Sequence, residues 1–202
     1  MITEKNTIKA EAIYDETHQH RLWWSHKWNN QKPMACIITL HPSISDTIMM
    51  DTTTFLCVNG VRKLEDEGYG GVIIVNLFSL LTSKLQMRWA RDIDINHLEN
   101  DNYIKKAAEE SSKIIFAWGR GANNVRILKR AKQVVELLSE HSEKFCVISD
   151  GKRKLLHPLT PECRNMTWLL APFDFEETFA DIIKDDKNEK DEIEKADNKA
   201  PT

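Results

Sequence analysis

The sequence predicts an α/β protein: a three-layer αβα sandwich around a central, mainly parallel sheet of four strands. Three observations predict this class. Four short apolar runs rich in β-branched residues are spread along the chain, segments with helical periodicity lie between them, and 202 residues with 41% hydrophobic content suffice for one ordinary core. Strands that alternate with helices form right-handed crossover units, which place the strands parallel with helices on both faces.

The four expected strands are the apolar runs themselves. Their continuous Val, Ile and Ala content is typical of strands that are buried on both faces. They cover residues 35–40, 72–75, 114–117 and 145–148.

Three helices are expected between these strands. The first covers 52–67, with Asp51 as its N-cap, although Gly60 weakens the pattern. The second covers 102–111. The third has the clearest periodicity, because apolar residues recur at helical spacing at Val125, Leu128, Val135 and Leu138.

We expect three regions along the chain. Residues 1–30 form an aromatic and basic segment packed on the domain, 31–180 form the α/β domain, and 181–202 form a charged, disordered tail. The aromatic and basic residues within 20–28 would either stack nucleobases or cover one edge of the sheet, and we favour the second interpretation. The segment 80–100 is long for a connection, so we expect a functional loop there.

The charge pattern limits the classes of partner. The tail holds eight acidic and five basic residues, and removing it leaves 23 of each in the body. A neutral body argues against tight, nonspecific binding to duplex nucleic acid, which depends on many phosphate contacts. No run approaches the roughly 18–20 apolar residues that cross a bilayer, and the N-terminus lacks the apolar run of a secretion signal. We therefore expect a cytoplasmic protein that does not bind a membrane.

The cysteines and carboxylates indicate no cofactor and no metal. The four cysteines are far apart and form no Cys-x-x-Cys pair, so neither a zinc site nor a disulfide framework is expected. Cys36 and Cys146 lie in apolar runs, which predicts a place in the core. Asp46 and Asp51 alone are weak grounds for a metal site.

Small polar motifs follow each expected strand. The carboxyl ends of parallel strands meet at one edge of the sheet, where α/β proteins bind their ligands. The motifs are His41-Pro42-Ser43, Asn76 with Phe78, Trp118-Gly119-Arg120, and His157-Pro158-Leu159 after a short basic loop.

The order and spacing of these motifs resemble a bacterial and phage family known as domain-of-unknown-function family 1643. The resemblance covers about residues 21–159. The matching pieces lie at 40–46, 51–53, 67–71, 75–78, 100–101, 116–119 and 157–159.

A more distant resemblance is to the uracil-DNA glycosylase superfamily. Its members place an Asn-Pro or Asp-Pro turn after one strand, an Asn after a second, Trp-Gly after a third and a His-Pro loop late in the chain. The resemblance implies a uracil-DNA-glycosylase-like fold and a pocket for a base taken out of the stack. The expected substrate-binding residues are Pro42, Ser43, Asn76, Phe78, Trp118, Gly119, Pro158 and Leu159.

The resemblance also implies roles for individual side chains. Asn76 would read the polar edge of the base, because its amide offers an acceptor beside donors; the alternative is an Asn that caps a strand end. His157 would stabilise negative charge on the departing base. His41 stands where the superfamily carries Asn or Asp. A neutral imidazole accepts a proton from water at that place, or Asp46 or Asp51 supplies the carboxylate.

Four basic residues are candidates for phosphate binding: Arg120, Lys152, Arg153 and Lys154. For the last three, a solvated turn is the more common explanation of such an isolated trio.

Three functions stay open on the sequence alone. The first is a glycosylase-like protein that binds a nucleobase and hydrolyses an N-glycosidic bond in DNA or a nucleotide. The second is a catalytically inactive nucleotide sensor or protein-binding module in phage and bacterial conflict. The third is an enzyme acting on free nucleotides or modified bases. The expected partner is a nucleic acid, single-stranded or with a flipped base, or a nucleotide; the inactive alternative adds a protein partner.

Overall fold

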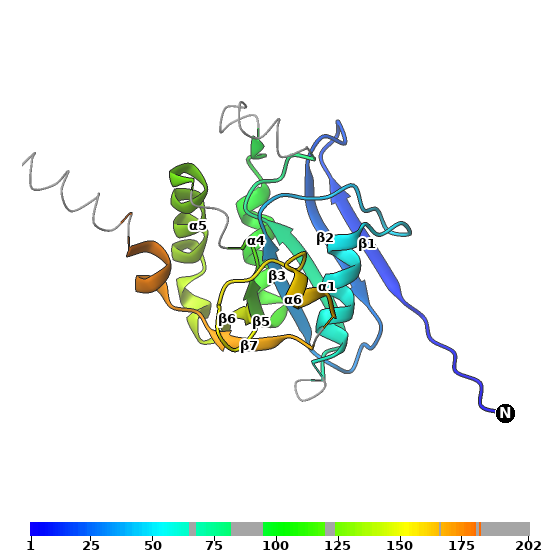
Figure 1. Cartoon of the computed structure of the whole chain (residues 1–202). Helices are drawn as coiled ribbons and strands as arrows, with labels where there is room; N and C mark the ends of the chain where they lie inside the picture. The colour runs from blue at the N-terminus through cyan, green and yellow to red at the C-terminus, as the bar shows by residue number, and fades with distance from the viewer. Residues whose placement is uncertain (65–67, 82–94, 120–123, 166, 181, 183–202) are drawn as a thin grey trace, which may run out of the picture.

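A mixed sheet forms the centre of the structure, with its strands in the order β1-β2-β4-β3-β5-β6-β7 (Figure 1). This computed structural model describes residues 1–64, 68–81, 95–119, 124–165, 167–180 and 182. Four neighbouring strands of the sheet are parallel, namely β4 (Gly71–Asn76), β3 (Met34–Thr39), β5 (Ser111–Phe116) and β6 (Phe145–Ser149). They coincide with the four predicted apolar runs, so the α/β class and the parallel centre are confirmed.

The prediction of a four-stranded sheet is wrong, because the described residues contribute seven strands. Two of the further strands, β1 (Lys9–Tyr14) and β2 (Arg21–Lys27), add to the β4 edge, and β7 (Leu169–Pro172) adds to the β6 edge; all three are antiparallel. Polar residues in β1 and β2 hide these two strands from a search for continuous apolar runs, whereas β7 is apolar but only four residues long. The segment 1–30 thus supplies two strands of the sheet.

The three predicted helices are confirmed with adjusted bounds. They are α1 (Thr52–Arg62), α4 (Asn100–Glu109) and α5 (Val125–Leu137). Asp51 is the N-cap of α1, as predicted, and its side chain accepts a hydrogen bond from the Thr54 amide. A 3₁₀ segment, η1 (Ser139–Lys144), and the short helix α6 (Pro161–Asn165) complete the described helices.

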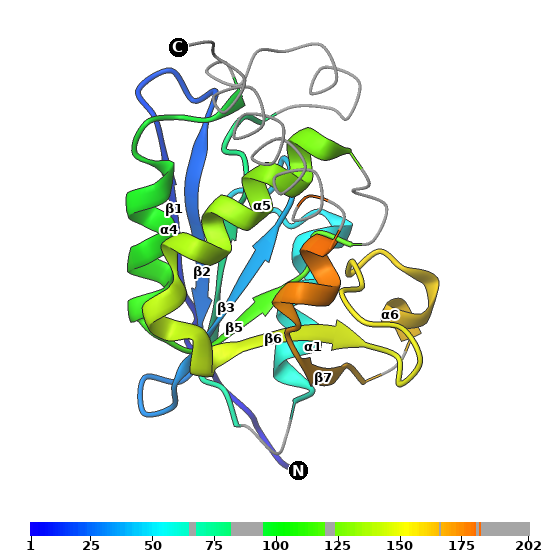
Figure 2. The ribbon, with the colours of Figure 1, turned by 90° about the vertical axis from the view of Figure 1, so that its left-hand side faces the viewer.

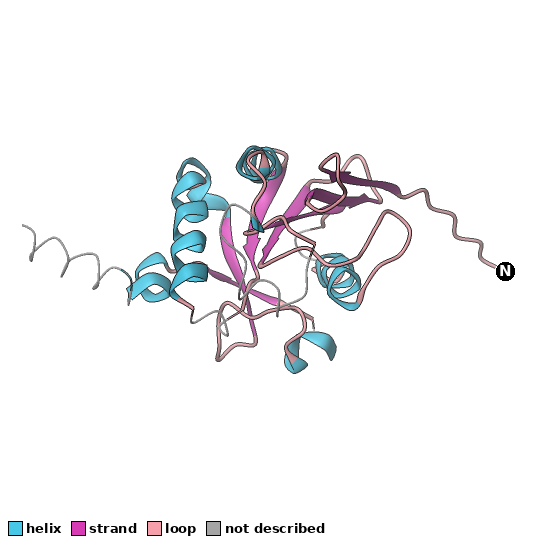
Figure 3. Ribbon diagram, turned by 90° about the horizontal axis from the view of Figure 1, so that it is seen from above, coloured by secondary structure: helices cyan, strands magenta, loops and turns pink. Residues whose placement is uncertain are grey.

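Helices α4 and α5 cover one face of the sheet, and α1 and α6 cover the other (Figures 2 and 3). Ile38 and Phe116 belong to the apolar cluster that contains residues of α4 and α5, whereas Ile37 and Ile115 belong to the cluster that contains residues of α1 and α6. Neighbouring residues of one strand face opposite sides, so continuous apolar runs are the expected pattern for a sheet covered twice.

The four cysteines are free and buried, and Cys36 and Cys146 lie in the core as predicted. Within the described ranges, no helix has the length and apolarity needed to cross a bilayer. Most of the predicted tail, the middle of the predicted functional loop and Arg120 lie outside the described residues.

Candidate ligand-binding site

The connections that leave β3 and β5 diverge to opposite faces of the sheet. β3 leads into α1 on one face and then to β4, while β5 leads into α5 on the other face and then to β6. β3 and β5 are neighbours in the sheet. Such a topological switch point opens a crevice at the carboxyl ends of the strands, where open α/β sheets bind ligands.

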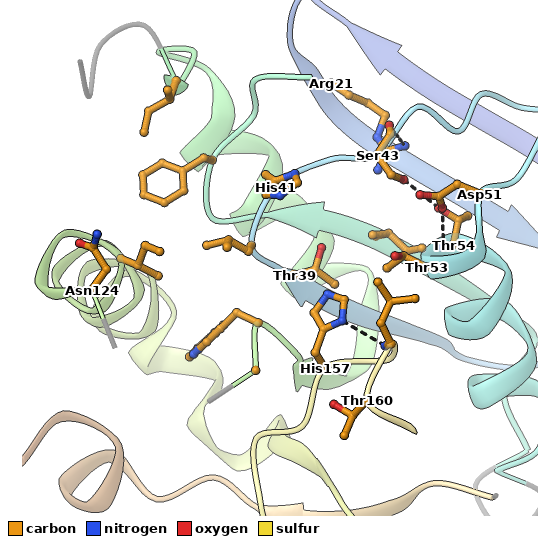
Figure 4. A pocket seen from close by; sticks show the side chains of 18 of the residues that line it. Arg21, Thr39, His41, Ser43, Asp51, Thr53, Thr54, Asn124, His157 and Thr160 are labelled. Carbon is orange, nitrogen blue, oxygen red and sulfur yellow. Dashed lines mark hydrogen bonds between the residues drawn. The ribbon is translucent and has the colours of Figure 1, made fainter. Parts of the chain in front are cut away.

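A cavity of about 870 Å³ lies at this switch point, and we call it the switch-point cavity. Residues from all four parallel strands or the loops after them line it (Figure 4). The structure brings together eight of the predicted site residues in its lining: His41, Ser43, Asp51, Phe78, Trp118, Gly119, His157 and Leu159.

The loop after β3 is held in place by side chains of β2. The Trp24 indole N–H donates to the Asp46 carbonyl at 2.7 Å, and Arg21 Nη1 donates to the Ser45 carbonyl at 3.0 Å. His26 Nε2 lies 3.4 Å from the Thr47 carbonyl, and its ring stacks on Trp24. One wall of the cavity therefore depends on the aromatic and basic segment that precedes the predicted domain.

An irregular register between β1 and β2 aims Arg21 at this loop. Ile13 pairs with Trp23 but Tyr14 pairs with Arg21, so Leu22 is an extra residue in β2. Strict alternation would place Arg21 on the face of Trp23, opposite to Trp24. The bulge moves the Arg21 side chain to the other face of the sheet. Arg21 therefore lies on the same face as Trp24, and both contact the loop after β3.

Asp51 lies in a network of hydroxyls at the start of α1. Its Oδ1 accepts from the Thr54 amide at 2.8 Å and from Ser45 Oγ at 3.0 Å, while Ser45 Oγ lies 2.8 Å from Thr54 Oγ1. Burial raises the pKa of Asp51, but these hydrogen bonds and one from Ser43 outweigh burial, so the pKa lies below its usual value. Asp51 is therefore an ionised helix cap at the cavity wall.

His157 lies close to Gly119 and has a defined tautomer. The Leu159 amide donates to His157 Nδ1 at 3.1 Å, so neutral His157 carries its proton on Nε2. Gly119 adopts a φ of +82°, and an added Cβ would lie 2.9 Å from the Cβ of His157. The glycine thus provides both the turn and the space that the Cβ and backbone of His157 occupy.

His41 and two aromatic side chains form further parts of the wall. His41 is half-buried, and its Nδ1 lies 3.2 Å from the Pro42 carbonyl. Phe78 and Trp118 are buried and line the cavity. The Trp118 indole N–H is buried without a hydrogen-bond partner among the residues that the structure describes.

Asn76 lies beneath the cavity and is absent from its lining. Thr39 and Asn76 are register partners at the ends of β3 and β4, and Asn76 Nδ2 donates to Thr39 Oγ1 at 2.6 Å. Thr39 itself lines the cavity. Asn76 therefore orients the Thr39 hydroxyl that faces the ligand space.

The other predicted site residues lie outside the lining. The Asp46 carboxylate accepts from the amides of Ile48 and Met49 within its own turn, and Pro42 and Pro158 are buried. Of the basic trio, Arg153 pairs with Asp150 and Glu162, Lys154 pairs with Glu177, and Lys152 is exposed.

Sequence reasoning missed several polar lining residues. They are Arg21, Thr39, Thr53, Thr54, Asn124, Arg126 and Thr160. The Asn124 N-cap before the third predicted helix was a usable signal, because a helix that follows a parallel strand begins at the ligand edge of the sheet. Arg21 gave a weaker signal: a charge directly before an aromatic strand.

The fold and the cavity together define an α/β protein with a candidate ligand site at the topological switch point of its sheet. Residues 21–159 match the family described as "Protein of unknown function (DUF1643)", and the chain belongs to this family. The match begins at β2 and ends at Leu159 of the cavity wall, so the family region contains every predicted catalytic residue. Neither a curated protein nor a solved structure shows significant similarity to the chain.

Proposed function

We propose that the protein binds a nucleobase-containing ligand in the switch-point cavity and hydrolyses its N-glycosidic bond. The observation that carries the proposal is the convergence of two imidazoles, His41 and His157, with Phe78 and Trp118 in one cavity. A volume of about 870 Å³ lies in the range of cavities that hold small molecules. The parallel centre and the polar strand ends support the expected relation to the uracil-DNA glycosylase superfamily.

His157 has the form required to stabilise the departing base. When the bond between the sugar C1′ and the base nitrogen breaks, its electron pair leaves with the base as negative charge. The Leu159 amide keeps Nδ1 of His157 unprotonated, so the donor of the neutral ring is Nε2–H. A preorganised donor at the departing base lowers the barrier without waiting for solvent to reorganise.

His41 is the proposed base for the attacking water. The water oxygen bonds to C1′ and one water proton passes to the imidazole, so the products are a free base and a sugar with a hydroxyl at C1′. Imidazole is suited to this transfer because its pKa lies near neutral pH. Thr39, oriented by Asn76, offers a hydroxyl to the polar edge of the base.

A ligand-binding protein without catalysis is the second candidate, and the state of the carboxylates favours it. Asp46 caps its own turn, and Asp51 caps α1. Both carboxylates therefore accept hydrogen bonds that hold the local backbone. Within the described lining, His41 is then the candidate that takes a proton from the attacking water. Catalysis in the first candidate consequently depends on His41.

Incubation with two substrate sets tests the proposal. One set is single-stranded oligonucleotides with uracil or modified bases, followed by alkaline cleavage at abasic sites. The other is free nucleosides and nucleotides, with chromatography for released base. Release by the wild type and a loss of at least about tenfold in His157→Gln are expected.

His141→Gln is the matched control, because His141 lies in η1 before β6, at the end of the sheet remote from the cavity. Ligand binding without base release by the wild type and by His41→Asn would favour the binding protein. No binding of any nucleobase compound would overturn both candidates.

A further inference from the structure

Arg21 is a buried cation at the wall of the switch-point cavity. Its side chain is 2% exposed, and it donates through Nη1 to the carbonyls of Ser43 and Ser45. Among the described residues, its Nε is buried without a hydrogen-bond partner and no carboxylate forms an ion pair with it. Burial lowers the pKa of Arg21 to about 10, which leaves the guanidinium charged at neutral pH.

We infer that the Arg21 end of the cavity binds a terminal phosphate, so that the ligand is a nucleoside monophosphate. A buried charge is costly unless an opposite charge and hydrogen bonds compensate it, and carbonyl oxygens supply only the hydrogen bonds. The planar guanidinium matches a phosphate group, because its donors form parallel pairs with the oxygens. This inference rests on the proposed function for the nucleobase part of the ligand.

Hydroxyls and a helix terminus surround the guanidinium. Ser43, Thr53 and Thr54 line the same part of the cavity, and Figure 4 shows Ser43 between Arg21 and the start of α1. The eleven-residue helix α1 begins at Thr52, so the positive end of its dipole lies at this wall. Hydroxyl donors and a helix N-terminus are common partners of phosphate oxygens.

Asp51 limits the affinity of this subsite. Its carboxylate lines the cavity and interacts electrostatically with Arg21, although the two groups form no ion pair. Oδ1 of Asp51 is bonded to the Thr54 amide and to Ser45 Oγ. Removing this charge while keeping the cap therefore favours an anion at Arg21.

The depth of Arg21 favours a terminal phosphate over one within a strand. A phosphodiester continues as a chain on both sides, so it does not reach a guanidinium buried under a wall, whereas a monoester enters the cavity by itself and carries more charge. Figure 4 shows Arg21 and Asn124 on opposite sides of the cavity, with His41 between them. A nucleotide bound in this orientation would place its phosphate at Arg21 and its base toward Asn124.

Comparison of ligands on the wild type tests the subsite without any substitution. Calorimetry with the full chain compares inorganic phosphate, a nucleoside panel, the matching 5′-monophosphates, and oligonucleotides without a terminal phosphate. We expect the monophosphates to bind about 10- to 100-fold more tightly than the nucleosides, as charge-assisted contacts imply. Equal affinity of nucleoside and monophosphate would overturn the inference.

Three variants locate the effect. Arg21→Gln should abolish the advantage of the monophosphate over the nucleoside, and Asp51→Asn should increase it, because Asn also caps helices. Arg62→Gln is the control. It removes the same charge from the exposed C-terminal end of α1 and should leave the affinity ratio of monophosphate to nucleoside unchanged. If Arg21→Gln does not fold, the affinity of the monophosphate relative to the nucleoside is measured in Asp51→Asn alone. A ratio equal to that of the wild type counts against the phosphate subsite.

The outcomes separate this inference from the proposed function. Binding of nucleosides with no gain from phosphate would leave the proposed function standing and end the phosphate subsite. Binding of inorganic phosphate that Arg21→Gln removes, with no effect of any nucleobase, would support the subsite and end the proposed function. Preference for the oligonucleotides over the monophosphates would show that the phosphate comes from a polymer, against our inference.

Discussion

An added Cβ on Gly119 would lie 2.9 Å from the Cβ of His157. The loop after β5 and the base of the His157 side chain, in the loop after β6, are therefore in close contact. The position of the candidate donor depends on a residue without a side chain.

Gly119→Ala should lower both stability and ligand affinity. The left-handed φ costs an alanine about 1 kcal/mol, and the clash with His157 adds about 1–3 kcal/mol. Gly151→Ala is the matched control: Gly151 has a φ of +86°, but an added Cβ would meet only Leu169 at 3.8 Å. Urea unfolding and ligand titration of both variants check this, and an equal loss in the two would contradict the proposed contact.

Gly60→Ala should destabilise the protein, although this exchange inside a helix normally stabilises by about 1 kcal/mol. A Cβ at Gly60 would lie 2.5 Å from the Trp168 ring, so overpacking outweighs the gain in helix propensity. The measurement is the urea midpoint. Combining Gly60→Ala with Trp168→Leu should recover part of the loss, and an additive double variant would show that the ring is not the cause.

Trp24→Phe removes the hydrogen bond from the indole to the Asp46 carbonyl, which should lower stability by about 1 kcal/mol. Because this bond holds the loop after β3, the loss of ligand affinity should be larger than the loss of stability. Trp28→Phe is the control. It also removes an indole donor, to the Tyr69 carbonyl at 3.1 Å, but at the far end of β2. Equal effects of the two variants on affinity would argue against the role of β2 in holding the loop.

Acid should weaken the start of α1. The pKa of Asp51 lies below its usual value, so the stability from its ionised cap is present above the unfolded value of about 3.9 and is lost as pH falls through the lower folded pKa. Asp51→Asn should therefore lose less stability than the wild type between about pH 4 and pH 2, as measured by urea midpoints at intervals of about half a pH unit. A wild-type pH profile in the variant would contradict this assignment.

The thiols should resist labelling in the native state. Burial raises the pKa of Cys36 and of Cys57, and it raises the pKa of Cys163 to about 11. The thiolate is the reactive form, so little of it is present at neutral pH. An aromatic disulfide reagent should label the four cysteines only after denaturant is added, and fast labelling without denaturant would show that the core opens.

The parallel centre was predictable because each of its strands is covered on both faces, which leaves a continuous apolar run in the sequence. β2 is covered on both faces too, yet it contains Arg21, Ser25 and His26 among its buried residues. Their partners are loop carbonyls and a neighbouring indole, and these depend on tertiary structure. Sequence periodicity therefore did not predict β2.

The cavity was predictable in outline because the carboxyl ends of parallel strands meet. The bulge at Leu22 and the pairing of Thr39 with Asn76 were not, since each depends on the register between strands distant in sequence. Asn76 consequently looked like a group in contact with ligand, whereas it holds Thr39. The place of Arg21 in the cavity wall was not predictable for the same reason.

The place of β2 between β1 and β4 also has a consequence for biosynthesis. β2 is translated well before β4, and its second neighbour emerges only after residue 76 has been made. At roughly 5–20 residues per second, this delay lasts roughly 2–10 s. During that time Trp23 and Trp24 have a single hairpin partner on the nascent chain, so ribosome-associated chaperones that bind exposed aromatics should govern the yield of folded protein.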